Sequence, residues 1–363
     1  MKYHIITFGC QMNKADSERI ATILESKGYR SASKENEADL IVVNMCSVRQ
    51  SAVDRVYGLI PKFKKIREKN PGVKTILTGC ILKKDKKKFQ KGFDLVLNIK
   101  DLPRWHLYPV FHGRGKQDIN YKDYLAIKPI YQSSLLAFVP ISNGCNNFCS
   151  YCVVPFTRGP LICRDHKEIL KETKTALIKG LKEIWLLGQN VNDYHSPTNS
   201  SINFAKLLKM VNNIPGNFKI FFVSPNPKNF SEEMIKILSS CKKFGKLLNL
   251  PVQSGDNQIL KKMNRSYTVE QYKNLVRKIR KKIPNLNLST DVIVGFPGET
   301  KKQFENTMKL FKEIKFNYAY IAKYSPRPGT VAFQMKDNIS WEEKKRREKT
   351  LRELISTGAT RSK

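Results

Sequence analysis

The chain has 363 residues, of which 40% are hydrophobic and 27% charged, and its 66 Lys and Arg against 31 Asp and Glu give a formal net charge of +35. At ~150 residues per domain this length suggests about two domains, and the composition excludes collagen-like, mucin-like and wholly disordered proteins. The positive charge favours a polyanionic partner, although lysines that only solvate helix faces would explain it equally well.

The amino-terminal region, residues 1–112, alternates between strand-like and helix-like segments. Apolar strand runs occur at 3–7, 40–44 and 75–77, and helical spacing at 17–27 and 53–69. This order predicts a parallel sheet flanked by helices. The polar segment 113–133 has the composition of a linker.

In the carboxy-terminal region, residues 134–363, a strand-like segment followed by a helix-like segment occurs six times. Six units with right-handed crossovers predict an α/β fold that curls into an incomplete (β/α)6 barrel, two units short of closure. The predicted strands are 135–141, 183–187, 219–223, 246–250, 286–294 and 318–324, and the predicted helices are 165–179, 204–211, 231–241, 269–282, 300–314 and 341–355.

No apolar stretch approaches the ~20 residues needed to span a bilayer, and the start, residues 1–5, is a strand-like run rather than a signal peptide. We therefore expect a cytoplasmic protein with no membrane partner. In a reducing compartment, its eight cysteines are more often metal ligands or core residues than disulfides.

Three of these cysteines form a CxxxCxxC motif, Cys145, Cys149 and Cys152, directly after the first predicted barrel strand. That is the end of a barrel at which chemistry takes place. A structural zinc site normally has four ligands in two separated pairs, so three cysteines in one loop leave it one ligand short. An iron–sulfur cube with three cysteine ligands and one open iron fits better, with zinc or an inert loop as the alternatives.

Three further cysteines each end a predicted amino-terminal strand: Cys10, Cys46 and Cys80. Because the carboxyl ends of parallel strands meet at one sheet edge, we expect these thiols to converge there and to hold a second cluster. Gly9 and Gly79 would allow a bulky cofactor to approach the backbone closely. The alternative is three buried structural cysteines, the role that we assign to the two remaining thiols, Cys163 and Cys241.

The chain resembles the radical S-adenosylmethionine (SAM) methylthiotransferases along nearly its whole length. Within that family it is most similar to the branch that modifies N6-isopentenyladenosine beside the tRNA anticodon, mainly through residues 10–13 and 188–192. The matching segments are 8–13, 44–50, 78–80, 144–145, 152–159, 186–192, 250–255, 262–268 and 295–300.

This resemblance implies two 4Fe–4S clusters, SAM as a cofactor and tRNA as the substrate. One SAM would give a methyl group to sulfur on the amino-terminal cluster, and a second would yield the radical that removes hydrogen from C2 of the adenine. Because a carbon radical must meet sulfur before water quenches it, the two domains should face each other. We expect a monomer that takes electrons from a donor protein, with the sulfur source left open.

Three alternatives to this activity remain at the sequence level. Related enzymes modify an aspartate of a ribosomal protein or threonylcarbamoyladenosine in tRNA, and a basic RNA-binding protein with structural cysteines is the non-enzymatic alternative. The family normally continues into a small RNA-binding β-barrel, which this sequence, ending at Lys363, does not include. Phosphate contacts would then come from the basic clusters 83–91, 277–282 and 344–347.

Polar residues near the predicted strand ends are candidates for contacts with SAM or substrate, each weighed against an ordinary structural role. No catalytic residue is assigned beyond the cluster ligands. Asparagines at 226, 229 and 249 stand where the family more often has His or Asp, so proton transfer is not carried over to them. The candidates of this kind are Gln189, Asn190, Ser254 and Asp291. The resemblance adds Tyr151, just before the third motif cysteine, as the aromatic position whose backbone lies near the adenine of SAM in this family.

Overall fold

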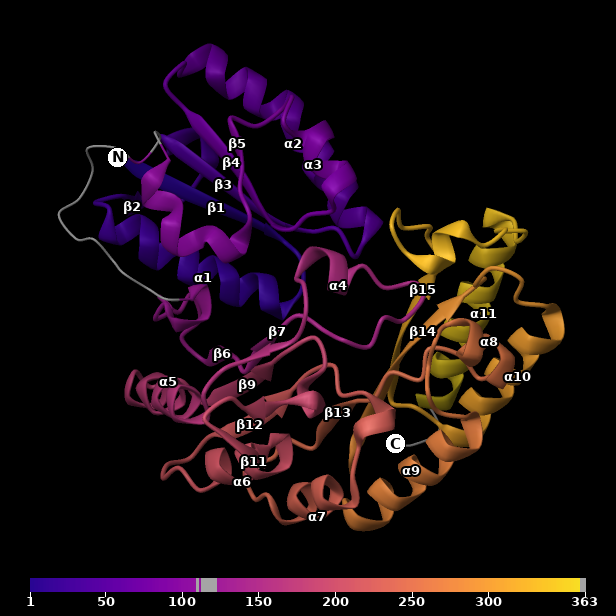
Figure 1. The fold of residues 1–363 in the computed structure, drawn as a ribbon. Helices are drawn as coiled ribbons and strands as arrows, with labels where there is room; N and C mark the ends of the chain where they lie inside the picture. Colours follow the sequence, from indigo (N-terminus) through magenta and orange to yellow (C-terminus); the bar gives the residue numbers. More distant parts are fainter. Residues whose placement is uncertain (109–110, 112–122, 360–363) are drawn as a thin grey trace. The chain divides into compact units, whose positions relative to one another are not determined.

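The computed structural model describes residues 1–108, 111 and 123–359, which divide into two compact units (Figure 1). The first contains residues 1–140 and 153–159, and the second contains residues 141–152 and 160–363. These units do not coincide with the predicted boundaries. Part of the predicted linker lies outside the described residues, and the rest contributes buried side chains to the first unit, among them Tyr124 and Leu125.

The first unit contains a five-stranded parallel sheet in the order β2-β1-β3-β4-β5. Helix α1 covers one face, and α2 and α3 cover the other (Figure 1). The bounds are β1 (Lys2–Phe8), α1 (Gln11–Ser26), β2 (Arg30–Ser31), β3 (Leu40–Cys46), α2 (Gln50–Lys69), β4 (Lys74–Cys80), α3 (Lys83–Phe89) and β5 (Leu95–Val96).

The central strand β3 is buried along its whole length, as its continuous apolar sequence predicts for a strand covered on both faces. Its odd-numbered side chains, such as Ile41 and Val43, pack against Phe63 of α2 and Phe89 of α3. Its even-numbered side chains therefore face α1. Shorter elements complete the unit: η1 (Glu35–Glu37), η2 (Ile99–Leu107), η4 (Tyr124–Ala126), β6 (Leu136–Pro140) and α4 (Val154–Thr157).

The second unit has two parallel ladders, β9–β12 and β13–β14–β15, joined by an isolated parallel bridge between Ile220 and Phe244. The long helices lie outside the strands (Figure 1). The main elements are α5 (His166–Ile178), β9 (Glu183–Leu187), α6 (Phe204–Asn212), β12 (Lys219–Phe222), α7 (Glu232–Ser240), β13 (Leu247–Asn249), α9 (Val269–Lys282), β14 (Asn287–Val294), α10 (Lys301–Ile314), β15 (Tyr318–Lys323) and α11 (Trp341–Ala359).

The predicted class, parallel α/β, is confirmed, and each of the six predicted barrel strands is present as β6, β9, β12, β13, β14 and β15. The first of them, β6, belongs to the first compact unit rather than to the second. Among the described residues no helix combines the length and the apolarity needed to cross a membrane.

Several short elements lack the periodicity that predicts the long ones. Helix α3 has the sequence KKDKKKF, in which only Phe89 is buried, so its apolar signal is a single residue. The other short elements are β7 (Ser142–Asn143), β8 (Ile162–Cys163), η5 (Val191–Asp193), β10 (His195–Ser196), β11 (Asn199–Asn203), η6 (Pro227–Asn229), α8 (Asn257–Lys262) and η7 (Val331–Gln334).

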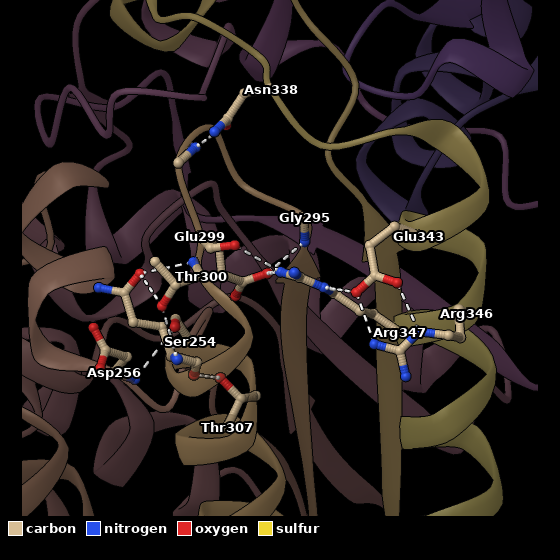
Figure 2. Close-up of polar contacts among 12 residues, drawn as sticks. Ser254, Asp256, Gly295, Glu299, Thr300, Thr307, Asn338, Glu343, Arg346 and Arg347 are labelled. Carbon is tan, nitrogen blue, oxygen red and sulfur yellow. Dashed lines mark hydrogen bonds and ion pairs between the residues drawn. The ribbon is translucent and has the colours of Figure 1, made fainter.

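The turn after β14 is closed by a buried carboxylate (Figure 2). Glu299 accepts a hydrogen bond from the backbone of Gly295 at 2.7 Å and another from Arg347 of α11, also at 2.7 Å. A Cβ on Gly295, which has φ +68°, would lie 2.3 Å from Lys344. The segment 295–300 therefore fastens the last helix to the end of a barrel strand.

Candidate functional sites

The loop after β7 brings the motif cysteines Cys145, Cys149 and Cys152 together, and we call them the loop triad. The backbone N–H of Cys152 donates to the carbonyl of Cys149 at 2.9 Å, which forms a tight turn. The amide of Asn147 donates to the sulfur of Cys145 at 3.5 Å. None of the three cysteines forms a disulfide within the described residues, and burial raises the pKa of Cys145. The loop thus offers three sulfur ligands within eight residues.

Hydrogen bonds with the end of α8 and the two residues after it support this loop. Ser150 donates from its N–H to the carbonyl of Met263 at 3.1 Å and from its hydroxyl to the carbonyl of Lys262 at 2.7 Å. The amide of Asn264 donates to the carbonyl of Phe148 at 3.0 Å. Phe148 is exposed and has a left-handed φ of 40°, a strained value that persists only where neighbouring contacts hold it.

A guanidinium also contacts the loop triad. Arg265 donates to the sulfur of Cys149 at 3.4 Å and to the carbonyl of Pro251 at 3.4 Å. Its cation lies over the ring of Tyr267, 5.1 Å from the centroid. The guanidinium thus places a positive charge beside a sulfur of the loop triad.

The amino-terminal cysteines lie at the carboxyl edge of the sheet, as predicted, and we call Cys10, Cys46 and Cys80 the N-terminal triad. Cys46 and Cys80 are directly opposite in the register of β3 and β4, and Cys10 is the N-cap residue of α1, two residues beyond β1. Strands β1, β3 and β4 are neighbours in the sheet. Adjacent strand ends therefore present all three sulfurs.

Two buried asparagines organise this edge. The amide of Asn13 donates to Asn44 at 2.9 Å and to the carbonyl of Met45 at 3.2 Å, and its oxygen accepts from the backbone of Cys10 at 3.3 Å. These contacts change the predicted role of the two glycines: a Cβ on Gly9 would lie 2.2 Å from Asn13, and a Cβ on Gly79 would lie 2.2 Å from the Met45 carbonyl. They make room for protein atoms, not for a cofactor.

The thiols of the N-terminal triad influence one another. A hydrogen bond between Cys46 and Cys80 is the largest cause of a lowered pKa at Cys46 and a raised pKa at Cys80. Burial raises the pKa of Cys10, and the charge of Cys80 adds to that effect. Binding of a metal cluster would release the protons that remain on these thiols.

Arg158 contacts the N-terminal triad from the segment 153–159 of the same unit. Its Nε donates to the sulfur of Cys80 at 2.9 Å, one Nη donates to Asp16 at 2.6 Å, and the other lies 3.3 Å from the hydroxyl of Tyr124. The side chains of Arg158 and Asp16 are 2% and 0% exposed. This contact was missed at the sequence level, because 78 residues separate Arg158 from Cys80.

Each triad fits an iron–sulfur cube better than a single metal ion. Over the parts of the chain that the structure describes, no three His, Cys, Asp or Glu side chains gather tightly enough to ligate one ion. The cysteines of a cube bind different iron atoms, so their sulfurs need not meet at one point. At both places, three cysteines outside any disulfide and an adjacent guanidinium match the three ligands of a cube whose fourth iron is open.

The five candidates for cofactor contacts all have protein partners. The oxygen of Gln189 accepts from the backbone of Gly144 at 2.5 Å, and the amide of Asn190 donates to Asp193 at 2.5 Å. Ser254 accepts from the backbone of Asp256, Asp291 accepts from Asn249, and Tyr151 packs on the apolar cluster around Met263. Gln189 thus positions the residue before Cys145, while contact of any of the five with SAM stays a prediction.

The three predicted phosphate-binding clusters differ in the structure. Prediction of the cluster 344–347 as a phosphate site is wrong for Lys344 and Arg347, which are 3% and 4% exposed and paired with Asp337 and Glu299. In the cluster 277–282, Lys278 pairs with Glu232 and Arg280 donates to the carbonyl of Ile314. The lysines of α3 are all exposed and, within the described residues, form no ion pair.

Comparison with known families agrees with this geometry. The Radical SAM superfamily model matches residues 139–311, and the model of Uncharacterized protein family UPF0004 matches residues 2–98. The second unit, with its loop triad, therefore defines a radical SAM enzyme. Its cofactors are SAM and 4Fe–4S clusters.

Curated relatives carry a more specific name. Proteins named tRNA-2-methylthio-N(6)-dimethylallyladenosine synthase are 41% identical in Clostridium novyi and 40% identical in Carboxydothermus hydrogenoformans. The matches cover 98% and 97% of this chain and 81% and 82% of those proteins. The chain belongs to this family of tRNA methylthiotransferases.

Solved structures support the fold alone. The radical SAM methyltransferase TsrM from Kitasatospora setae matches with a TM-score of 0.64 at 14% identity, over 92% of this chain and 75% of that one. The cobalamin-dependent radical enzyme OxsB matches with a TM-score of 0.60 at 12% identity, over 98% of this chain and 56% of that one.

Proposed function

We propose that this protein adds a methylthio group to C2 of N6-isopentenyladenosine next to the tRNA anticodon. The observation that carries the proposal is the pair of separate cysteine triads, each outside any disulfide and each contacted by a guanidinium. A SAM-dependent radical needs one cluster, and a sulfur transfer needs a second. The names of the relatives support the same substrate.

In this proposal the loop triad holds the cluster that binds SAM, and the N-terminal triad holds the sulfur-transfer cluster. When bound, these groups supply the electron, the 5′-deoxyadenosyl radical that takes hydrogen from C2, and the methylated sulfur that replaces it. The residues of the chain supply position and shielding. Asn147 and Arg265 orient the sulfurs of the loop triad, and Asn13 fixes the backbone at Cys10.

Burial serves the chemistry on the amino-terminal side. Cys46 and Cys80 are each 4% exposed, and the polar groups beside them are satisfied by Asn13, Asn44 and Arg158. Because protein groups make these polar contacts, bulk water is not needed at the site. Exclusion of water protects a reactive carbon radical and a sulfur nucleophile from side reactions.

The substrate RNA would be bound by electrostatic attraction to exposed lysines. The sequence KKDKKKF of α3 begins three residues after Cys80 and exposes five lysines near the sheet edge that carries the N-terminal triad. Phosphates contacted there would make binding steeply salt-dependent. We expect the protein to act as a cytoplasmic monomer supplied by an electron donor protein, with the sulfur donor still to be identified.

The decisive experiment is nucleoside analysis of tRNA from cells with and without the gene. We expect 2-methylthio-N6-isopentenyladenosine to disappear on deletion and its unmodified precursor to accumulate. Restoration by the intact gene, but not by one with Cys46→Ala, is the matched control. Loss of a methylthio group from a ribosomal protein aspartate or from threonylcarbamoyladenosine, with the isopentenyl nucleoside unchanged, would overturn the assignment.

A further inference from the structure

The buried contact between Arg158 and Cys80 joins two residues that belong to different elements and lie 78 residues apart. Arg158 lies just beyond α4, and its partners include the Cys80 sulfur at 2.9 Å, Asp16 at 2.6 Å and, more weakly, the Tyr124 hydroxyl at 3.3 Å. All of these residues belong to the first compact unit. The guanidinium therefore connects the triad to α1 and to the segment around η4.

Such an arrangement is costly to fold. Removing a guanidinium and a carboxylate from water carries a desolvation penalty that their mutual attraction often only just offsets, so apolar residues of similar size would serve stability as well. Arginine cannot shed its charge to escape that penalty, because its pKa exceeds about 12. A buried arginine aimed at a sulfur ligand is therefore better explained by what it does to the sulfur.

The charge balance at the triad gives this arginine a function. Three thiolates around a 4Fe–4S core with two positive charges leave one net negative charge, and reduction adds another. A cation beside one sulfur stabilises the more negative state, and a hydrogen bond to that sulfur acts in the same direction. Asp16 opposes the cation, since its carboxylate lies 2.6 Å from the Arg158 guanidinium.

We propose that Arg158 is a positioning residue that holds the Cys80 sulfur and raises the reduction potential of the sulfur-transfer cluster, while Asp16 limits that increase. The inference rests on the proposed function, because it assumes a cluster on the N-terminal triad. It assigns to the pair a task outside the binding of SAM or RNA: keeping this cluster in the redox state suited to carry sulfur.

The test uses full-length protein with Cys145, Cys149 and Cys152 all changed to Ala, so that one cluster remains. Potentiometric titration followed by electron paramagnetic resonance is compared in this background and in versions that also carry Arg158→Met, Arg158→Lys or Asp16→Asn. We expect the highest reduction potential in D16N, a lower one in the background protein without a further substitution, a lower one again in R158K, and the lowest in R158M. The lysine variant keeps the charge but cannot reach both Cys80 and Asp16.

Shifts of opposite sign in the reduction potential of the arginine and aspartate variants distinguish an electrostatic effect from a structural one. A purely structural role predicts that the arginine and aspartate variants both lose iron and shift in the same direction, and that outcome overturns the proposal. If R158M does not bind a cluster, the order of the reduction potentials of D16N, the background protein and R158K still tests the proposal. The matched control is Arg265→Lys in the same background, because Arg265 belongs to the second unit and its sulfur partner, Cys149, is already replaced by Ala; an equal shift there would also overturn the proposal.

Failure of this inference differs from failure of the proposed function. A cluster that loads on the N-terminal triad with a potential indifferent to Arg158 and Asp16 removes only the inference. Absence of any iron on that triad in the triple-alanine protein removes both, and the nucleoside analysis then shows whether methylthiolation proceeds without it.

Discussion

Arg347 lies 2.7 Å from a carboxylate oxygen of Glu299, and their side chains are 5% and 1% exposed (Figure 2). Arg347 also donates to the main-chain carbonyl of Glu299 at 2.9 Å, so α11 is held to the turn after β14 by both side chain and backbone. Burial raises the pKa of Glu299, and the hydrogen bonds from Gly295 and Arg347 act against it.

Replacing Arg347 by Met should therefore cost about 3–5 kcal/mol of unfolding free energy, because it leaves a buried carboxylate without its cation. Urea denaturation followed by circular dichroism measures the loss. The double variant E299Q/R347M should recover much of it, since no charge is then stranded. A double variant no more stable than R347M would show that packing, and not the unpaired carboxylate, dominates.

Glu343 predicts a pH-dependent contribution to stability. Its hydrogen bond from Arg346 is the largest cause of a lowered pKa, about 2, and the bond from Arg347 adds to it. A carboxyl group whose pKa is lower in the folded state stabilises the fold above its unfolded pKa of 4.5, and that stability is lost as pH falls toward 2.

Because the pair with Arg346 is partly exposed, we expect E343Q to cost at most about 1 kcal/mol near pH 7. The difference from the unmodified protein should shrink steadily between about pH 4.5 and pH 3 in urea denaturation series. A difference that stays constant across this range would mean that Glu343 acts through packing alone.

Iron content tests the two triads independently. Reconstituted protein should hold about eight iron atoms per chain, and alanine substitution of either triad should leave about four. Cys163→Ala and Cys241→Ala serve as controls, and both should leave the iron content unchanged. Loss of all iron from either triple variant would indicate that the triads do not load separately.

Gly79 and Gly216 offer a matched pair of alanine substitutions. Both have positive φ, +107° and +114°, so each change strains the backbone by ~1–3 kcal/mol. A Cβ on Gly79 would also lie 2.2 Å from the Met45 carbonyl, whereas on Gly216 the nearest atom is 4.0 Å away. In the protein with Cys145, Cys149 and Cys152 changed to Ala, we expect G79A to lose iron from the N-terminal triad. We expect G216A to lose stability only.

The exposed lysines of α3 should contribute to tRNA affinity. Changing Lys84, Lys87 and Lys88 to Ser should weaken binding and reduce the slope of log affinity against log salt by up to ~0.9 for each phosphate that is no longer neutralised. Filter binding at several salt concentrations gives the slope. The same change at three exposed lysines of α5, Lys167, Lys171 and Lys174, is the charge-matched control; an equal effect there would indicate non-specific attraction.

Periodicity predicted the long elements well, because each buries a regular apolar face: residues 269–282 form α9 and residues 183–187 form β9 as expected. The convergence of Cys46 and Cys80 was also predictable, because both end neighbouring parallel strands. Arg158 was not, since nothing local to a sequence motif indicates which distant carboxylate and thiol a guanidinium will meet.

Clusters of like charge illustrate the same limit. In the sequence, the segment 344–347 and the lysines of α3 look alike, yet Lys344 and Arg347 are buried and the α3 lysines are exposed. The difference comes from acidic partners, Asp337 and Glu299, that only the fold brings near.

Because Cys46 and Cys80 are opposite each other in neighbouring strands, metal binding depends on the register between β3 and β4. Side chains alternate between the two faces of a sheet, so sliding β4 by one residue against β3 would turn one sulfur toward α2 while the other still faced α1. A single-residue insertion or deletion within either strand should therefore abolish metal loading even where the protein still folds, whereas the same change in a connecting loop should be tolerated.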